Sequence, residues 1–125
     1  MILDSDVLID LIREQPASTA WLEGLPELPH AAGFAAMELV AGSQSAKELR
    51  DTQTFLSAYA LAWPSEAEMA HALTDLMPLR LAHGIGLLDT VIAATARGRK
   101  ETLVTFNVRH YRHVPGLVTL QPYTR

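Results

Sequence analysis

The stretch Met1-Ile2-Leu3-Asp4-Ser5-Asp6-Val7-Leu8-Ile9 at the start of the chain predicts its fold class. The apolar residues that open it are too few for anything but a buried strand, and they run directly into an acid. After the acid the apolar positions take helical spacing through Leu11 and Ile12, and Ser5 is able to cap that helix. A short buried strand followed at once by a helix is typical of a parallel α/β sheet.

Asp4 and Asp6 fall where this predicted strand ends. In an open parallel sheet, ligands bind in the crevice beyond the carboxyl ends of the strands, so an acid there is placed for chemistry. The alternative is that both residues only cap the helix and favour its positive end. Residues elsewhere in the chain have to decide between these two interpretations.

Strands alternate with helices along the rest of the chain. Further strands are predicted at residues 30–34, 59–63, 102–106 and 118–120. Helices are predicted around Trp21 and Leu22, over 35–41, over 45–58, from Ser65 to about Met77, and from Leu87 to Gly98. This alternation predicts a parallel sheet that is covered by helices on both faces.

Local signals predict several helix ends. Ser65-Glu66-Ala67-Glu68 matches a capping box at the start of a helix. Pro78 should kink this helix or end it near Asp75 to Met77. The apolar face of that helix is predicted to be Met69, Leu73, Leu76 and Met77. Gly98 is the predicted stop of the last long helix.

The composition is that of an ordinary globular protein, with 125 residues, 49% hydrophobic and 19% charged. This length predicts one domain over residues 1–125. The chain has no cysteine, which excludes disulfides and thiolate metal sites, so any metal must sit on oxygen or imidazole ligands. Neither a secretory signal nor a membrane-spanning stretch is present, and we expect a cytoplasmic protein.

Charge is distributed unevenly along the chain, although the net charge is −4. Residues 1–96 hold thirteen acids and four Lys or Arg, whereas residues 97–125 hold one acid and six. A basic end on an acidic body can still offer phosphate a landing surface, because association responds to local fields. The alternative is that Arg97, Arg99 and Lys100 only favour the negative end of the preceding helix.

Two further acids lie inside apolar helical stretches. Glu38 lies between Met37 and Leu39, and Asp89 follows Leu88. Either has a simple explanation, with Glu38 facing solvent and Asp89 acting as a helix N-cap. Together with Asp4, however, they can converge at one crevice of a parallel sheet.

Convergence of three carboxylates is unfavourable without a cation. Two carboxylates about 5 Å apart repel by roughly 3 kcal/mol at an effective dielectric constant of 20. A divalent ion reverses that balance, and an all-oxygen ligand set favours Mg²⁺ or Mn²⁺ over zinc. Such an ion can activate water and hold a phosphate oxygen, as in metal-dependent phosphodiester hydrolysis.

Four stretches of the chain resemble, in order, the four motif regions of PIN-domain ribonucleases, and most closely the VapC toxins of bacterial toxin–antitoxin pairs. They are Ile2-Leu3-Asp4-Ser5-Asp6-Val7-Leu8-Ile9, Met37-Glu38-Leu39-Val40-Ala41-Gly42, Gly86-Leu87-Leu88-Asp89-Thr90-Val91-Ile92-Ala93-Ala94-Thr95-Ala96 and Leu103-Val104-Thr105-Phe106-Asn107-Val108-Arg109-His110-Tyr111. The resemblance covers essentially the whole chain. Each motif alone is weak, but four in the same order are a strong signal.

The resemblance implies a three-layer α/β/α domain with a short, mainly parallel sheet, which binds Mg²⁺ or Mn²⁺ and cleaves RNA. By position, Asp4, Glu38 and Asp89 correspond to the catalytic, metal-binding acids of the family. The resemblance further implies a homodimer and a small VapB-like antitoxin whose segment occupies the groove and inhibits the enzyme.

The fourth acidic position of the family is altered in this chain. Many relatives have Asp where Asn107 stands, and an acid where His110 precedes Tyr111. Either Asn107 is a neutral ligand or Asp6 supplies the missing carboxylate, which leaves one or two metal ions open. Thr105 can orient water or a carboxylate, or act simply as a strand former.

Arg109 and Arg112 follow the predicted site and can hold substrate phosphates, with surface solvation as the alternative. Two other functions also fit parts of the sequence. One is a phosphatase of the haloacid dehalogenase type with Asp4 as nucleophile and Asp6 as general acid, although Val7 replaces the usual Gly and the chain is short. The other is a PIN-like binding module with little or no catalysis, which the altered fourth position favours.

Overall fold

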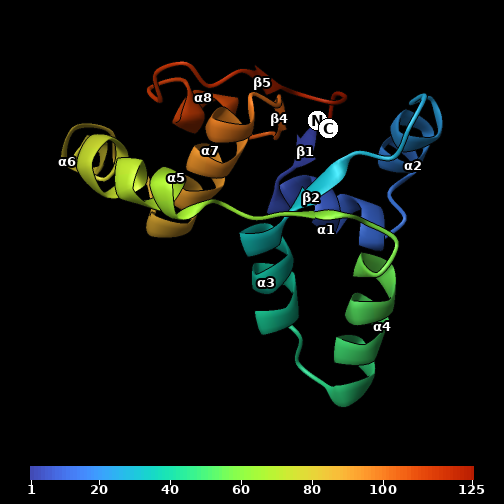
Figure 1. The fold of residues 1–125 in the computed structure, drawn as a ribbon. Coiled ribbons are helices and arrows are strands. Elements are labelled where there is room, and N and C mark those ends of the chain that lie inside the picture. Colours follow the sequence, from blue (N-terminus) through green and yellow to red (C-terminus); the bar gives the residue numbers. More distant parts are fainter.

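Five short parallel strands form one sheet, in the order β3-β2-β1-β4-β5, in the computed structural model, which describes residues 1–125 (Figure 1). The strands are β1 (Ile2–Leu3), β2 (His30–Ala32), β3 (Leu61–Ala62), β4 (Leu103–Val104) and β5 (Thr119–Leu120). Ile2 is in register with His30 on one side and with Leu103 on the other, which makes β1 the central strand.

Helices connect all of these parallel strands. Between β1 and β3 lie α1 (Ser5–Ile12), α2 (Pro16–Glu23), α3 (Gly33–Ala41) and α4 (Ala46–Leu56). After β3 come α5 (Glu66–His71), the π-helical turn η1 (Ala72–Leu76), α6 (Leu79–His83), α7 (Leu87–Arg99) and α8 (Val108–Tyr111). None of the helices has both the length and the apolar character needed to cross a bilayer.

The order of the strands places these two groups of helices on opposite faces. Crossovers between parallel strands are right-handed, and the chain moves outward from β1 to β3 and then returns to β4 on the other side of β1. Helices α1–α4 therefore cover one face and α5–α8 the other, and Figure 1 shows the two groups on either side of the sheet. The predicted α/β/α architecture is confirmed, and the strand order reverses between β1 and β4.

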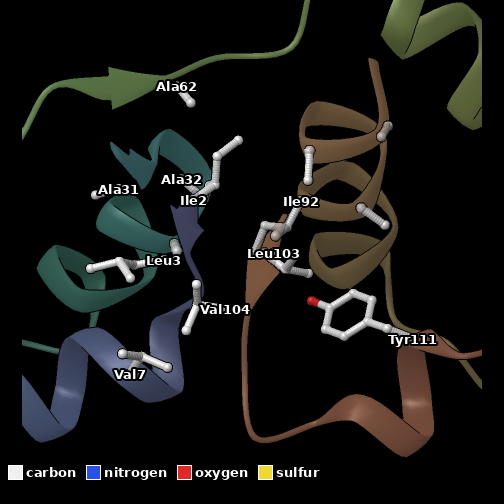
Figure 2. Packing of buried hydrophobic residues seen from close by; sticks show 14 of the residues in the cluster. Ile2, Leu3, Val7, Ala31, Ala32, Ala62, Ile92, Leu103, Val104 and Tyr111 are labelled. Atoms are coloured by element: carbon white, nitrogen blue, oxygen red, sulfur yellow. The ribbon is translucent and has the colours of Figure 1, made fainter. Parts of the chain in front are cut away.

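The hydrophobic core lies around β1 and β4, the two strands between which the strand order reverses. Ile2, Leu3, Leu103 and Val104 are all 0% exposed. In Figure 2 their side chains face Val7 of α1, Ile92 of α7 and Tyr111 of α8. Because both faces of a parallel sheet are buried, its strands are continuous apolar runs and not alternating patterns.

Several predicted boundaries were wrong. The predicted strand 30–34 ends at Ala32, because Gly33 is already the first residue of α3. The N-cap of α1 is Asp4 and not Ser5, since the Asp4 side chain accepts a hydrogen bond from the Ser5 amide. Residues 59–63 and 102–106 each contribute only two residues to the sheet.

The helix that Ser65 caps ends before Pro78 as predicted, because η1 stops at Leu76, but its inner structure differs from the prediction. The capping box of Ser65 and Glu68 is confirmed, but the helix then widens into the π turn, in which the Met77 amide donates to the Ala72 carbonyl. Of the predicted apolar face, Leu76 is buried, whereas Met69 and Leu73 are exposed. Beyond Pro78 the chain forms α6, which was not predicted.

Gly98 does not end α7. The helix continues to Arg99, and Lys100 takes the left-handed conformation at its end, with a φ of 56°. Gly98 serves a packing purpose, because an added Cβ would lie 2.4 Å from Cγ of Glu68 on α5. The glycine thus allows α5 and α7 to approach each other closely.

Gly33 provides a test of the packing that starts α3. An added Cβ would lie 2.4 Å from Cε3 of the Trp63 ring, so Gly33→Ala should lower the free energy of unfolding by roughly 1–3 kcal/mol. Gly42→Ala is the matched control, because Gly42 has a φ of −79° and its Cβ would lie 3.4 Å from the nearest atom. Urea denaturation should show a change below about 1 kcal/mol for this control. Equal losses for both variants would contradict the packing argument.

Candidate metal centre

Asp4 lies where β1 and β4 end side by side. It is 4% exposed, and its amide donates to the Val104 carbonyl at 3.0 Å, which continues the pairing of the two strands. Its Oδ1 accepts from the Ser5 amide at 2.8 Å, and its Oδ2 accepts from the Thr105 hydroxyl at 2.9 Å. Asp4 is therefore both the N-cap of α1 and a buried carboxylate at the reversal of strand order, where ligands bind in such sheets.

Asp6 reaches the same point from the first turn of α1. Its Oδ2 accepts from the Phe106 amide at 2.9 Å and from the Thr105 hydroxyl at 3.2 Å. The hydroxyl has only one proton, which Asp4 and Asp6 share. The other oxygen of Asp6, Oδ1, is buried without a hydrogen-bond partner.

Glu38 and Asp89 come from the two helices that flank these strands. Glu38 is half-buried on α3, and its Oε1 is buried without a hydrogen-bond partner. Asp89 is the third residue of α7, whose N-cap is Gly86, so the interpretation of Asp89 as N-cap was wrong. The interpretation of Glu38 as a solvent-facing residue was also wrong, because one of its oxygens is enclosed.

The four carboxylates affect one another electrostatically. Burial, then the charge of Asp6 and then that of Asp89 raise the pKa of Asp4 to about 7. Burial also raises the pKa of Asp6, and burial with the charge of Asp89 raises the pKa of Glu38. Burial is the largest cause for all three acids, and the hydrogen bonds of Asp4 and Asp6 offset it only in part.

Tyr111 is a site residue that the sequence did not single out. Its side chain is 1% exposed, and its hydroxyl donates to Oδ1 of Asp89 at 3.3 Å. Burial and the charges of Asp4 and Asp89 raise the pKa of Tyr111, so one neutral hydroxyl faces both carboxylates. In Figure 2 the ring points from α8 into the core with its oxygen inward. The sequence signal that could have identified Tyr111 is its chemistry, because the hydroxyl of a buried tyrosine usually needs a hydrogen-bond partner.

The donor set fits a hard divalent cation. Asp6 Oδ1 and Glu38 Oε1 are buried acceptors without donors, which is costly unless a cation or water binds them. No three acidic or imidazole side chains converge closely enough to enclose an ion on their own. Mg²⁺ usually keeps several waters and takes only one or two carboxylates from the protein, so a partly hydrated ion is compatible with this arrangement.

Asn107 lies beside the acids and contributes to the site mainly through its backbone. It is the N-cap of α8, its side chain makes no capping hydrogen bond, and its amide donates to the Thr105 hydroxyl at 3.0 Å. His110 is turned elsewhere, with Nε2 3.2 Å from the Gly84 carbonyl oxygen. The Thr105 hydroxyl therefore connects Asn107 with Asp4 and Asp6, which is the orienting role considered from the sequence.

The basic residues do not form one surface. Arg97, Arg99 and Lys100 lie at the end of α7, just before β4, and so at the edge of the sheet opposite the acids. Arg109 and Arg112 are exposed on and just after α8, beyond the carboxyl end of β4. Only this second group lies on the side of the sheet that carries the carboxylates.

Comparison with known proteins agrees with this geometry. The family model of the PIN domain matches residues 1–116. A search of curated proteins by sequence gave no match.

Solved structures with the same fold come from bacterial toxin–antitoxin pairs. A toxin–antitoxin complex from Klebsiella pneumoniae has a chain that is 24% identical, with a TM-score of 0.77 and coverage of 99% of this chain and 98% of that one. DNA-bound VapBC from Salmonella typhimurium has a chain that is 22% identical, with a TM-score of 0.82 and 95% coverage of both. DNA-bound VapBC2 from Rickettsia felis has a chain that is 23% identical, with a TM-score of 0.78 and coverage of 95% of this chain and 96% of that one.

At these identities the solved structures establish a shared fold. The family model is the stronger finding, because it spans all four carboxylates and Thr105. The chain belongs to the PIN-domain family.

Proposed function

We propose that this protein is a VapC-type endoribonuclease that uses Mg²⁺ or Mn²⁺ to hydrolyse RNA phosphodiester bonds in the cytoplasm. Membership of the PIN-domain family supports a nuclease. The observation that carries the proposal is that four acids lie near one another in pairs at the reversal of strand order, Asp4 with Asp6 and Asp89 and Glu38 with Asp89. Asp6 Oδ1 and Glu38 Oε1 are also buried and unpartnered. Such an arrangement is unfavourable unless a cation balances it.

Each side chain has a distinct part in this proposal. Asp4, Glu38 and Asp89 would hold the cation, with Asp6 and Asn107 as further ligands. The bound ion would supply an activated water and a contact for the phosphate oxygen. Thr105 fixes the orientation of Asp4 and Asp6, and Tyr111 that of Asp89. These hydrogen bonds hold the carboxylates in place before substrate arrives.

Arg109 and Arg112 are the proposed contacts for the RNA backbone. Both are exposed beyond the carboxyl end of β4, next to Asn107 and the acids. An RNA strand that presents one phosphate to a cation on the acids would have its neighbouring phosphates near this cationic segment. Contacts of this kind position a nucleic acid without reading its sequence.

A groove beside Glu38 supports inhibition by an antitoxin. The groove has a volume of about 350 Å³ between α1, α3 and α4. Its apolar lining is Ile9, Ile12 and Leu39, and the rest is mainly polar or charged: Arg13, Glu38, Gly42, Glu48, Asp51 and Thr52. The solved structures of the same fold include toxin–antitoxin complexes. We propose that a VapB-like partner inserts a segment with both apolar and polar side chains here and covers Glu38, which would block access to the cation.

A second apolar surface supports a homodimer. Met37, Leu61 and Trp63 are 54%, 39% and 47% exposed, and they line a hollow between α3, β3 and the end of α4. Exposed apolar surface of this kind is a feature of protein–protein contacts. The patch includes the neighbour of Glu38, so a second copy here would lie close to the acids of the first.

Cleavage of RNA by the purified protein tests the activity. Cleavage should require Mg²⁺ or Mn²⁺, and Asp4→Asn and Asp89→Asn should each slow it at least about 100-fold, because each removes a charged ligand. Asp75→Asn is the matched control, since Asp75 is an exposed acid of η1 that pairs with His71. Cleavage that survives both site substitutions would contradict the proposal, and metal binding without cleavage would favour a binding module.

Stability against pH tests the charge on Asp4 in the protein stripped of metal with EDTA. The folded-state pKa of about 7 exceeds the ordinary value of 3.8, so the native state binds the proton more tightly and stability falls as pH rises between them. Asp4→Asn should therefore raise the free energy of unfolding by roughly 1–4 kcal/mol at about pH 8. The gain should vanish near about pH 4 in urea denaturation. A difference that is independent of pH would show that Asp4 is not the group responsible.

A further inference from the structure

Tyr123 and Arg125 lie against α1 and bind the carboxylate of Asp10. Arg125 binds Asp10 with two hydrogen bonds, from Nη2 to Oδ1 at 2.9 Å and from Nε to Oδ2 at 3.1 Å. The hydroxyl of Tyr123 donates to the same Oδ2 at 2.9 Å. We call Asp10, Tyr123 and Arg125 the C-terminal clasp. A two-point contact between guanidinium and carboxylate fixes orientation as well as distance.

The clasp also touches both supports of Asp6. Nη2 of Arg125 donates to the Asp6 carbonyl oxygen at 3.3 Å. The guanidinium carbon lies 4.1 Å from the centre of the Phe106 ring, and the Tyr123 ring meets Phe106 edge-on at 4.9 Å between centroids. Phe106 in turn gives its amide to Oδ2 of Asp6 at 2.9 Å. One guanidinium therefore holds the backbone that carries Asp6 and the residue that orients the Asp6 carboxylate.

We propose that the C-terminal clasp is a positioning element that holds Asp6 in place as a metal ligand. Asp6 lies in the first turn of α1, and Phe106 follows β4. The position of Asp6 therefore depends on the helix, and the position of Phe106 depends on the sheet. The clasp joins them from the outer side through Arg125. With Phe106 and Thr105 both bonded to Oδ2, Oδ1 is left free of donors for a cation. This proposal rests on the proposed metal site.

The ion pair between Arg125 and Asp10 should contribute little to the stability of the fold. The Arg125 side chain is 48% exposed, and ion pairs in such positions contribute little to folding. Its ring contact and its hydrogen bond to the Asp6 carbonyl are directed instead at the two groups that determine where the Asp6 carboxylate points. Loss of the guanidinium should therefore change the site more than it changes the stability.

Mn²⁺ titration of the full chain, followed by electron paramagnetic resonance, tests the link to metal binding. Arg125→Gln should weaken Mn²⁺ binding roughly tenfold, as removal of a group that orients a ligand does. Asp10→Asn, which removes the other half of the ion pair, should have the same effect. Arg99→Gln is the matched control, because Arg99 forms a comparable ion pair with Glu101 at the opposite edge of the sheet.

A double-mutant cycle separates positioning from a general effect. In an Asp6→Asn background, Arg125→Gln should cause no further loss of Mn²⁺ affinity, because the residue that it positions has already lost its charge. An equal tenfold loss in both backgrounds would overturn the proposal, since the clasp would then act without Asp6. Unchanged affinity in Arg125→Gln itself would overturn it as well.

Amide hydrogen exchange gives a readout that needs no metal. In the metal-free protein, Arg125→Gln should speed the exchange of the Phe106 amide, which bonds to Asp6, and leave the Leu103 amide of β4 unchanged. Faster exchange at Phe106 would support the clasp even if the wild type bound no Mn²⁺, an outcome that would refute only the metal site. Unchanged exchange at Phe106 would refute the clasp itself.

Discussion

Asp4 and Asp6 meet the hydroxyl of Thr105 where β1 and β4 end side by side, and two like charges have to be held there inside the protein. A single hydroxyl proton cannot satisfy both carboxylates, so each also takes a backbone amide, from Ser5 or from Phe106. These donors lower the cost of burial without removing it, because the pKa of both acids stays raised. The junction is therefore stable only because the surrounding structure is rigid and well packed.

The rest of the fold follows from holding that junction. Strands β1 and β4 are completely buried, so Asp4 and Thr105 extend from a fixed base. Asp89 enters from the N-terminal turn of α7, where the positive end of the helix favours an acid. Tyr111 reaches it from the other side with a neutral hydroxyl. Elements distant in sequence thus contribute either charge or a hydrogen-bond donor to one small volume, which is the condition for an electrostatically preorganised site.

What could be predicted from the sequence was determined by local chemistry. The strand that ends at Asp4 and the capping box of Ser65 were readable because a few adjacent residues determine them. Gly98 was misread because its purpose is to make room for Glu68, a residue thirty positions earlier. Tyr111 and the C-terminal clasp were missed for the same reason, since their partners are set by the fold and not by neighbours. The motifs contain the acids and also their donors Ser5, Thr105, Phe106 and Tyr111, but only the fold shows which donor meets which acid.

Asn107 leaves the β4 side of the site without a carboxylate. On the β4 side, Thr105, Phe106 and Asn107 contribute a hydroxyl and two amides, all of which act as donors. On the α1 side, Asp4 and Asp6 contribute two carboxylates. At the proposed metal site, a cation would be drawn toward α1, and its position would depend on how firmly the first turn of that helix is held. Arg125 acts on that turn, because it binds Asp10 one turn further along the helix and the carbonyl of Asp6 itself. The neutral Asn107 and the clasp on α1 would therefore belong to one arrangement in the proposed site, in which the orientation of the Asp6 carboxylate matters more than an additional charge on the β4 side.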